Sequence, residues 1–343
     1  MSRKGDELPP TTNYISAEVY IFSGQTQLDT WDLKDRLGTT PWAVYSKWLV
    51  QDLHLTMQRI RELADAFPFY QRVKCTGRPP VPERDLFVCF LVRQLFDITF
   101  RQLEGLMTLL TEFFQIEKVP DHTVLSKHNR SRRWSHIWQR FHNFVMSSLP
   151  PRHVTISTDA SGFSGRKRPW REWPHAAKAC QDWVKTHLAI ETDSFLILSY
   201  ELTKSNVHDS RMFGPVWDRL PSNAIPVMSL ADSAYHSNEI AETVLKHGAW
   251  PLHGIKKNAV FRPSPKNAYQ RMVFFIRMKP RTYAVFYGKR NHSETVNSMA
   301  SGRFGHRIRC RSKIGRKNEV HAKYQCHNIR MLAWMKFKKS YSV

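Results

Sequence analysis

The sequence is poor in acidic residues and in cysteine, and it has no long apolar run. Its 343 residues include 29 Asp and Glu against 52 Lys and Arg, which gives a formal net charge of +23. A surplus of this size indicates a polyanionic partner, and nucleic acid is the first candidate. A basic surface that is merely solvated is the alternative. The hydrophobic content of 41% and the 11 Trp are typical of a folded protein.

Cysteine is too scarce and too irregularly spaced to form a structural framework. The five cysteines form no Cys-x2-Cys pair, which is typical of reduced thiols in an intracellular protein. Four residues near the C-terminus offer zinc-binding atoms: Cys310, His321, Cys326 and His327. Their spacing matches no common zinc pattern, so the sequence does not favour a zinc site.

Long apolar segments are also missing. No stretch of 18 residues is apolar, and the first ten residues, MSRKGDELPP, contain no apolar region of an export signal. We therefore expect no membrane span and no export. The expected location is the cytoplasm, in association with the DNA of the nucleoid.

The character of the sequence changes twice along the chain. Residues 1–40 mix polar residues with Pro and Gly and indicate an irregular N-terminal arm. Residues 41–150 are predicted to form an all-α domain. Residues 151–343 are predicted to form a mixed α/β domain that ends in a basic helix, and the segment LPPR at 149–152 marks the boundary.

The predicted all-α domain combines amphipathic helices with a basic and aromatic surface. In residues 42–67 the apolar positions recur every three or four residues and share one face: Leu49, Leu53, Met57, Ile60, Leu63 and Phe67. Thr99 and Asp121 are expected to cap two later helices. In SRRWSHIWQRFHNFVMSSL (131–149) an apolar stripe lies beside several arginines. These features favour a DNA-binding helical domain, and an ordinary bundle with a wet basic face is the alternative.

The C-terminal part alternates between strand and helix patterns, which predicts a mixed α/β domain built on a central sheet. The predicted elements are, in order, a strand ending at Asp159, two strands within 183–203, a helix from Asp209, a strand ending at Asp232, a helix closed by Gly248, a strand at 251–257, a strand at 281–288 and a further helix.

Three acids stand out by their position in this pattern. Asp159 and Asp232 end two strands, and strand ends in α/β sheets open into the crevices where sites are built. Glu294 lies on a predicted helix and shares one helical face with Tyr287 and Arg290. Each acid also has a structural alternative. An Asp after a strand often caps a helix, and Glu294 could simply pair with Arg290.

Three carboxylates that converge on one point repel each other unless cations lie between them. Oxygen ligands favour Mg²⁺ or Mn²⁺. Two such ions can activate a water or a 3′-hydroxyl and stabilise the leaving oxygen at a phosphodiester. In a DNA-binding protein this combination indicates nuclease or strand-transfer chemistry.

Five motifs in this order resemble insertion-sequence transposases with an RNase H-like DDE domain, of the subgroup marked by Tyr-x2-Arg-x3-Glu. The matching segments are STDASGF (157–163), WVKTH (183–187), SNVHDSRMF (205–213), LADSAYHS (230–237) and YGKRNHSE (287–294). Upstream, GRPPVPERDLF, ITFRQLEGLM and VPDHTVLSKHNR are similar to the helical N-terminal part of the same proteins. The resemblance covers roughly residues 60–335 and implies an RNase H-like mixed-sheet catalytic domain after an all-α DNA-binding domain.

The resemblance also implies a role for each matching position. Asp159, Asp232 and Glu294 are the expected DDE triad, which holds two Mg²⁺ or Mn²⁺ ions. Tyr287 and Arg290 are expected to approach the DNA of the transposon end. Other residues are expected to contact phosphate or to line the rim of the site: Lys185, His187, Asn206, His208 and Asp209.

The implied activity is that of a DNA transposase. Such an enzyme hydrolyses the phosphodiester at the transposon end and then joins the freed 3′-OH to target DNA. The implied partners are terminal inverted repeats and target DNA, bound by a homodimer. An inactive or repurposed DNA-binding protein and a stand-alone RNase H-like nuclease are the alternatives.

Two features qualify or extend the resemblance. Relatives often carry Lys seven residues after the Glu, and Ser301 stands there in this chain, with Arg303 as the nearest cation. The 61 residues between Asp232 and Glu294 leave room for a helix and a strand or two, and not for a large inserted domain.

Two further basic segments are candidates for DNA contact. In GRKRPWREW (165–173) the cations can follow phosphates and the indoles can stack on unpaired bases; its candidate residues are Arg166, Lys167, Arg168 and Trp170. The C-terminal segment from Arg303 is predicted to end in a helix that packs on the sheet and presents a basic face.

Overall fold

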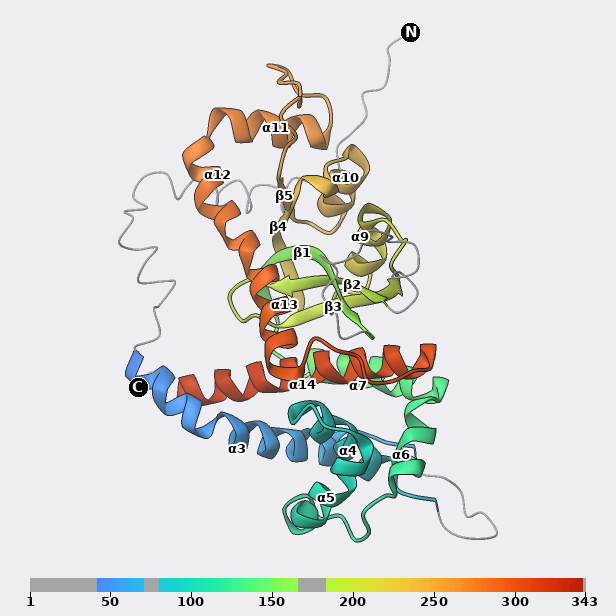
Figure 1. Ribbon diagram of the computed structural model, residues 1–343. Helices are drawn as coiled ribbons and strands as arrows, with labels where there is room; N and C mark the ends of the chain where they lie inside the picture. The colour runs from blue at the N-terminus through green and yellow to red at the C-terminus, as the bar shows by residue number, and fades with distance from the viewer. Residues whose placement is uncertain (1–41, 71–79, 166–182, 342–343) are drawn as a thin grey trace.

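The computed structural model describes residues 42–70, 80–165 and 183–341. The predicted arm at 1–40 and the basic segment that contains Arg166, Lys167, Arg168 and Trp170 lie outside the described residues. Figure 1 shows a layer of helices packed below a sheet, with further helices above and beside the sheet. No helix among the described residues is both long enough and apolar enough to cross a membrane.

A five-stranded mixed sheet forms the centre of the C-terminal part. The strand order is β3-β2-β1-β4-β5; β1 is antiparallel to β2, β2 is antiparallel to β3, and β4 runs parallel to both β1 and β5. The prediction of a mixed α/β fold on a central sheet is therefore confirmed. The strands are β1 (Arg152–Ser164), β2 (Trp183–Glu191), β3 (Ile197–Lys204), β4 (Ala224–Ala231) and β5 (Trp250–His253).

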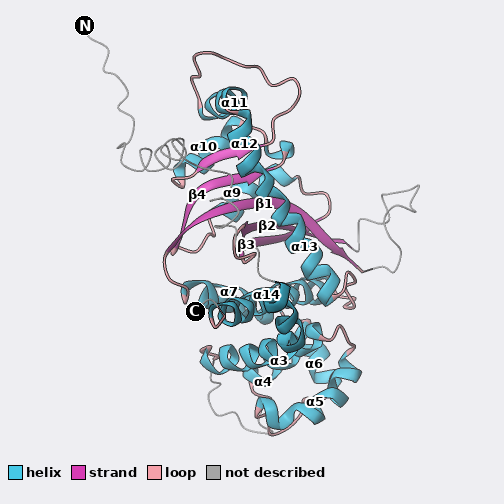
Figure 2. Cartoon of the chain, turned by 90° about the vertical axis from the view of Figure 1, so that its left-hand side faces the viewer, coloured by secondary structure: helices cyan, strands magenta, loops and turns pink. Residues whose placement is uncertain are grey.

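Helices cover both faces of this sheet, and the alternation of side chains along β1 assigns them to their faces. The Thr158 hydroxyl accepts a hydrogen bond of 3.0 Å from the Trp217 indole of α9 (Asp209–Trp217). The neighbouring Ser157 hydroxyl donates, at 3.0 Å, to the backbone carbonyl of Arg290, just before α13 (Asn291–Phe304). Adjacent strand residues point to opposite faces. Figure 2 accordingly shows α13 in front of the sheet, with α9 and α10 (Asn238–Lys246) behind it.

The N-terminal helices begin and end where their capping residues indicate. Thr99 accepts from the Gln102 amide and completes a capping box, and Asp121 accepts from the Thr123 amide. Both predicted caps are therefore confirmed. The helices of this layer are α3 (Trp42–Ala66), α4 (Glu83–Leu95), α5 (Phe100–Phe114), α6 (His122–Asn129) and α7 (Arg132–Ser147).

The predicted apolar face of α3 is buried only in its C-terminal half. Met57, Ile60 and Leu63 are buried, whereas Leu49 remains 49% exposed and Leu53 37% exposed. The first turns of α3 extend past α4, so the helix neighbours only the end of α14 (Lys313–Lys339) there. A repeating apolar pattern identifies the apolar face of a helix, but it does not show how much of that face other helices cover.

The prediction that the C-terminal helix presents a basic face to DNA is corrected by the structure. The middle of α14, residues 318–329, is buried throughout, because α3, α4 and α7 pack on one side of it and β2 and β3 on the other. Its exposed cations are confined to the two ends: Lys313, Lys317, Lys336, Lys338 and Lys339. The helix therefore forms the centre of the molecule between the helical layer and the sheet (Figure 1).

A second correction concerns the segment before α13. The predicted strand at 281–288 is a helix, α12 (Pro280–Tyr287), and the polar interval before it contains another helix, α11 (Ala268–Met278). Pro280 occupies the first helical turn, where its missing N–H is tolerated, and Asn267 caps α11 through the Gln270 amide. The connection from β5 to α13 is thus a pair of helices.

Two buried histidines of α14 make the fold sensitive to acid. Burial lowers the pKa of His321 to about 3, and the nearby positive charge of Lys317 lowers it further. Burial also lowers the pKa of His327 to about 4. Unfolded histidine titrates near 6.5, so below that pH the unfolded state binds more protons than the folded state. The stability from these neutral rings is complete above pH 6.5 and is lost as the pH falls towards the folded pKa values.

We expect the free energy of unfolding to fall between pH 7 and pH 5 by about 2 kcal/mol for each of these two histidines. His321→Gln should flatten the pH dependence, because glutamine does not titrate. The exposed residue His54 offers a matched control, His54→Gln. Urea unfolding at several pH values measures the effect, and identical slopes for wild type and His321→Gln would contradict this assignment.

Candidate active site

The pairing of β1 with β4 brings the first two acids together. The two strands run in parallel from Arg152 beside Ala224 to Thr158 beside Ala231. Asp159 is therefore the first residue of β1 beyond this pairing, and Asp232 is the first residue after β4. The predicted end of the first strand at Asp159 is wrong, because β1 continues to Ser164 by pairing with β2. Asp159 has no partner on the β4 side because β4 ends there, not because β1 does.

Asp232 also has the structural role that its position allowed. Its carboxylate accepts a hydrogen bond of 2.8 Å from the Ala234 amide and caps a one-turn 3₁₀ helix, Ser233–Tyr235. The cap orients the carboxylate at the end of β4. The capping interpretation and the site interpretation are thus compatible at this residue.

Glu294 lies in the first turn of α13, and the start of this helix is fixed to the sheet. The Ser157 and Ser293 hydroxyls both donate to the Arg290 carbonyl, at 3.0 and 2.9 Å. The His292 ring contacts the Thr192 carbonyl at 2.6 Å, in the turn between β2 and β3. Because Ser157 and Asp159 point to the same face of β1, these bonds hold α13 over the face that carries Asp159.

The three carboxylates share one electrostatic environment. Burial raises the pKa of Asp159 to about 6; the Arg290 guanidinium opposes this rise, and the negative charges of Asp232 and Glu294 add to it. Arg290 also donates a 2.6 Å hydrogen bond to Glu294, so the predicted salt bridge between them is present. The carboxylates of Asp159, Asp232 and Glu294 therefore repel one another, and the Arg290 guanidinium compensates part of their negative charge.

The carboxylates are close without being gathered into a closed site. Among the described residues, the one group of three metal-binding side chains whose ligand atoms all lie within 4.8 Å of one another is Glu104, Asp121 and His122. In that group the His122 ring already bonds to Glu104 at 2.7 Å. The sequence offered no reason to expect this second group.

The four residues considered for zinc do not form a group of this kind among the described residues. Each has a partner elsewhere. The Cys326 thiol lies against the Leu91 carbonyl, the His321 ring bonds to the Tyr200 hydroxyl, and the His327 ring contacts the Phe195 carbonyl. Cys310 accepts from the Asn129 amide group.

Tyr287 and Arg290 lie close to the carboxylates. A Cβ built on Gly254 would lie 2.7 Å from the Tyr287 hydroxyl and 3.0 Å from the Ser233 amide nitrogen. Only glycine therefore lets Tyr287 reach the turn that follows Asp232. Gly254 was not singled out from the sequence. Its position directly after β5 was the one feature that could have marked it as part of the site. Arg290 Nε is buried and has no hydrogen-bond partner among the described residues.

Residues 150–329, more than half of the chain, match the family model described as "Transposase DDE domain". The chain belongs to the DDE transposase family. The matched range contains Asp159, Asp232 and Glu294, together with the sheet and α13.

Two solved transposase structures are also similar to this DDE transposase family member. A cryo-EM structure of the piggyBac transposase synaptic complex with hairpin DNA is 10% identical and has a TM-score of 0.43, covering 85% of this chain and 74% of that chain. A crystal structure of a pre-cleavage Mos1 transpososome is 13% identical and has a TM-score of 0.18, covering 97% and 98%. Similarities this distant transfer no residue's role.

Lys185 and His187 lie on the opposite face of the DDE domain sheet from Asp159. In the β1–β2 pairing Asp159 is beside Leu188, whereas His187 is beside Ala160 and so shares the α9 face. Lys185 pairs with Asp209 at 2.6 Å, and His187 lies 3.6 Å from the same carboxylate. The structure does not bring these residues together with the three carboxylates. They hold the start of α9 instead.

The remaining candidate positions of the DDE domain are peripheral. Asn206 and His208 are exposed, and His208 contacts the Ser210 hydroxyl at 3.0 Å. Arg303 lies 4.0 Å from Asp52 of α3 at the far end of α13. Ser301 donates to the Ser298 carbonyl at 3.3 Å within α13, so its hydroxyl contacts its own helix.

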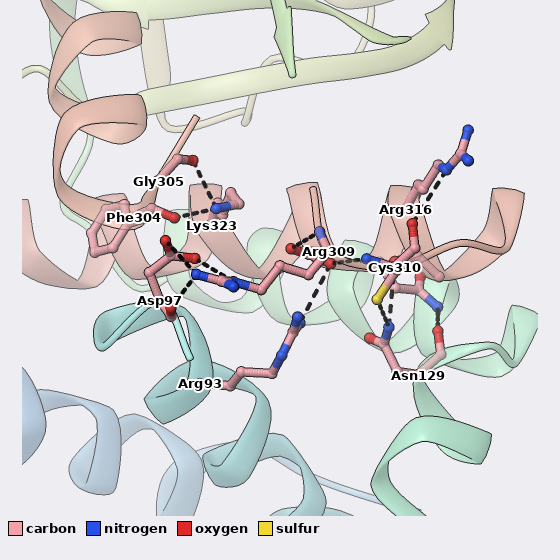
Figure 3. Close-up of polar contacts among 12 residues, drawn as sticks. Arg93, Asp97, Asn129, Phe304, Gly305, Arg309, Cys310, Arg316 and Lys323 are labelled. Atoms are coloured by element: carbon pink, nitrogen blue, oxygen red, sulfur yellow. Dashed lines mark hydrogen bonds and ion pairs between the residues drawn. The ribbon is translucent and has the colours of Figure 1, made fainter. Parts of the chain in front are cut away.

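A buried polar network fixes the far end of α13. The Lys323 ammonium donates to the backbone carbonyls of Phe304 and Gly305, the last of these at 2.8 Å. These carbonyls end α13, where a positive charge is favourable. Figure 3 shows Lys323 approaching both from α14, with the Arg309 guanidinium directed at Asp97 nearby. The helix that carries Glu294 is therefore held at both of its ends.

Proposed function

We propose that this protein is a DNA transposase of the Tyr-x2-Arg-x3-Glu subgroup, with an RNase H-like catalytic domain. It cleaves the phosphodiester at the terminal inverted repeats of its element and joins the freed 3′-OH to target DNA. The observation that carries the proposal is the β1–β4 register, which aligns Asp159 with Asp232 beneath the helix that presents Glu294. Membership of the DDE transposase family supports it.

The donor set fits hard divalent cations. All three side chains are carboxylates; burial raises the pKa of Asp159, and the negative charges of Asp232 and Glu294 add to that rise. Asp159, Asp232 and Glu294 would hold Mg²⁺ or Mn²⁺, with two ions expected. Such ions supply Lewis-acid activation of the attacking oxygen and stabilisation of the leaving oxygen.

Arg290 and Tyr287 are the residues best arranged to hold the DNA phosphate. Arg290 Nε is a buried donor without a partner among the described residues, and a phosphate oxygen is a suitable acceptor for it. Burial raises the pKa of Tyr287, so its hydroxyl keeps its proton at neutral pH and can donate. Both donors lie beside the carboxylates and would orient the scissile phosphodiester against them.

We also propose that the helical layer takes part in DNA binding and that the protein acts as a homodimer on DNA. Arg132 at the start of α7 is exposed and available for phosphate. Arg133 and Arg140 of the same helix are already engaged: Arg133 pairs with Glu83 at 2.6 Å, and Arg140 lies over the Tyr70 ring.

The test is cleavage of duplex DNA that contains the repeats flanking the gene. With Mg²⁺, we expect nicks at the repeat ends that expose 3′-OH groups, followed by joining of those ends to a second duplex; chelation of the metal should abolish both steps. Cleavage without joining would favour a nuclease. Salt-sensitive binding without any cleavage would favour an inactive DNA-binding protein and would overturn the proposal.

A further inference from the structure

The pair of helices between β5 and α13 carries an unusual charge distribution. From residue 247, directly after α10, to residue 293 the chain contains ten Lys and Arg and no Asp or Glu. The chain as a whole contains 29 acids, so the gap is not a consequence of general composition. This segment includes α11 and α12, the two helices that the sequence had not resolved correctly.

Most cations of the α11–α12 segment are exposed and unpaired. Seven are exposed and have no carboxylate partner among the described residues: Lys256, Lys257, Arg262, Lys266, Arg277, Lys279 and Arg281. Arginines of the helical layer behave differently, since many are paired with acids. Arg84 pairs with Asp65 at 2.7 Å, and Arg133 with Glu83 at 2.6 Å. Seven exposed cations without a carboxylate partner among the described residues therefore lie on α11, at its junction with α12, on α12 and in the loop before α11.

This positive surface is attached firmly to the sheet. Met272, Phe275 and Ile276 of α11 are buried in a cluster with Leu230 of β4 and Leu252 of β5. The helices thus stand at a fixed position beyond the β5 edge, as Figure 1 shows above the sheet. A surface with a fixed position can orient a ligand as well as attract it.

The α11–α12 segment also leads along the chain to the carboxylate of Glu294. α12 passes directly into the turn that contains Arg290 and then into α13. Arg281 precedes Arg290 by nine residues, a separation of about 14 Å along a helix at 1.5 Å per residue. At 3.4 Å per base pair, this corresponds to about four base pairs of duplex.

We propose that α11 and α12 bind the sugar-phosphate backbone of duplex DNA, about four base pairs from the phosphodiester at the three carboxylates. The inference rests on the proposed function and adds the surface that holds the DNA beside the cut. The contacts are with phosphates, so they are independent of base sequence and serve the element end and target DNA alike. A group of exposed cations held beside the site that is proposed to cleave a phosphodiester favours DNA over an acidic protein.

The test compares two triple variants that remove the same charge. The first is Arg277→Gln, Lys279→Gln and Arg281→Gln at the α11–α12 corner. The control is Lys204→Gln, Arg211→Gln and Lys246→Gln, at exposed positions on β3, α9 and α10. Binding of an end-containing duplex and of a random duplex is measured over a range of salt concentrations, after circular dichroism has verified folding.

The corner variant should bind both duplexes roughly 100-fold more weakly at 0.1 M salt, with a logarithmic salt slope flatter by about 2 to 3. The control should stay within about threefold of wild type. Equal weakening in both variants, or none in the corner variant, would overturn the inference and leave the proposed function untouched. Failure of the wild type to bind either duplex would overturn the proposed function itself. Selective weakening on the end-containing duplex alone would contradict the phosphate mechanism.

Discussion

Asp159→Asn, Asp232→Asn and Glu294→Gln should each reduce the rate of DNA strand cleavage by about 1,000-fold or more, equivalent to about 4 kcal/mol of transition-state stabilisation. Each substitution removes a carboxylate from the shared environment of β1, β4 and α13. DNA affinity without metal should remain within about twofold, because the phosphate contacts come from other residues. Single-turnover cleavage of end-containing DNA with saturating Mg²⁺ measures the effect.

Folding provides an internal control for this first prediction. Asp159→Asn should unfold at the same temperature as the wild type or a higher one, since it removes a charge that burial disfavours and that Asp232 and Glu294 repel. Glu104→Gln, in the separate group on α5, is the matched control and should cleave normally. Full cleavage by any folded variant of the three acids would show that the assignment is wrong.

Glu319→Gln should lower the free energy of unfolding by about 3–5 kcal/mol. The Glu319 carboxylate is completely buried; it lies 3.5 Å from Arg93 and accepts from the Arg309 and Cys310 amides at 2.9 and 3.0 Å. Glutamine would leave the Arg93 guanidinium buried without its counter-charge. It would also turn a donor towards one of the two amides, which needs an acceptor.

The control for this second prediction is Glu62→Gln, which affects an exposed acid that pairs with Arg59 at 2.8 Å. An exposed pair of this kind contributes less than about 1 kcal/mol. Urea unfolding at pH 7 compares the two variants. A loss of under 1 kcal/mol for Glu319→Gln would contradict a structural role for the buried pair.

Local signals in the sequence were sufficient for two helix caps and for placing Asp232 at the end of a strand and Glu294 on a helix. The caps at Thr99 and Asp121 depend on short-range hydrogen bonds, so their side chains could be read directly. Asp232 follows a buried strand whose end the sequence marks clearly. Glu294 followed from its spacing to Tyr287 and Arg290 along one helix.

The features that the sequence did not predict depend on contacts between residues far apart in the chain. The faces of Lys185 and His187 depend on the register of β2 against β1, and a shift of one residue would reverse them. The aromatic, β-branched pattern of residues 281–288 resembles a strand, and only Pro280 hinted at a helix start. The burial of α14 depends on the helical layer and the sheet closing around it, which no pattern within α14 encodes.

The most direct measurement locates the metal on the polypeptide. Fe²⁺, which accepts carboxylate ligands, generates hydroxyl radicals with ascorbate and peroxide that cut the chain close to the ion. We expect cuts near residues 159, 232 and 294 that excess Mg²⁺ suppresses and that Asp232→Asn weakens at all three positions. Cuts confined to the neighbourhood of Glu104, Asp121 and His122, or no Mg²⁺-sensitive cuts, would contradict a catalytic metal site formed by the three acids of the sheet and α13.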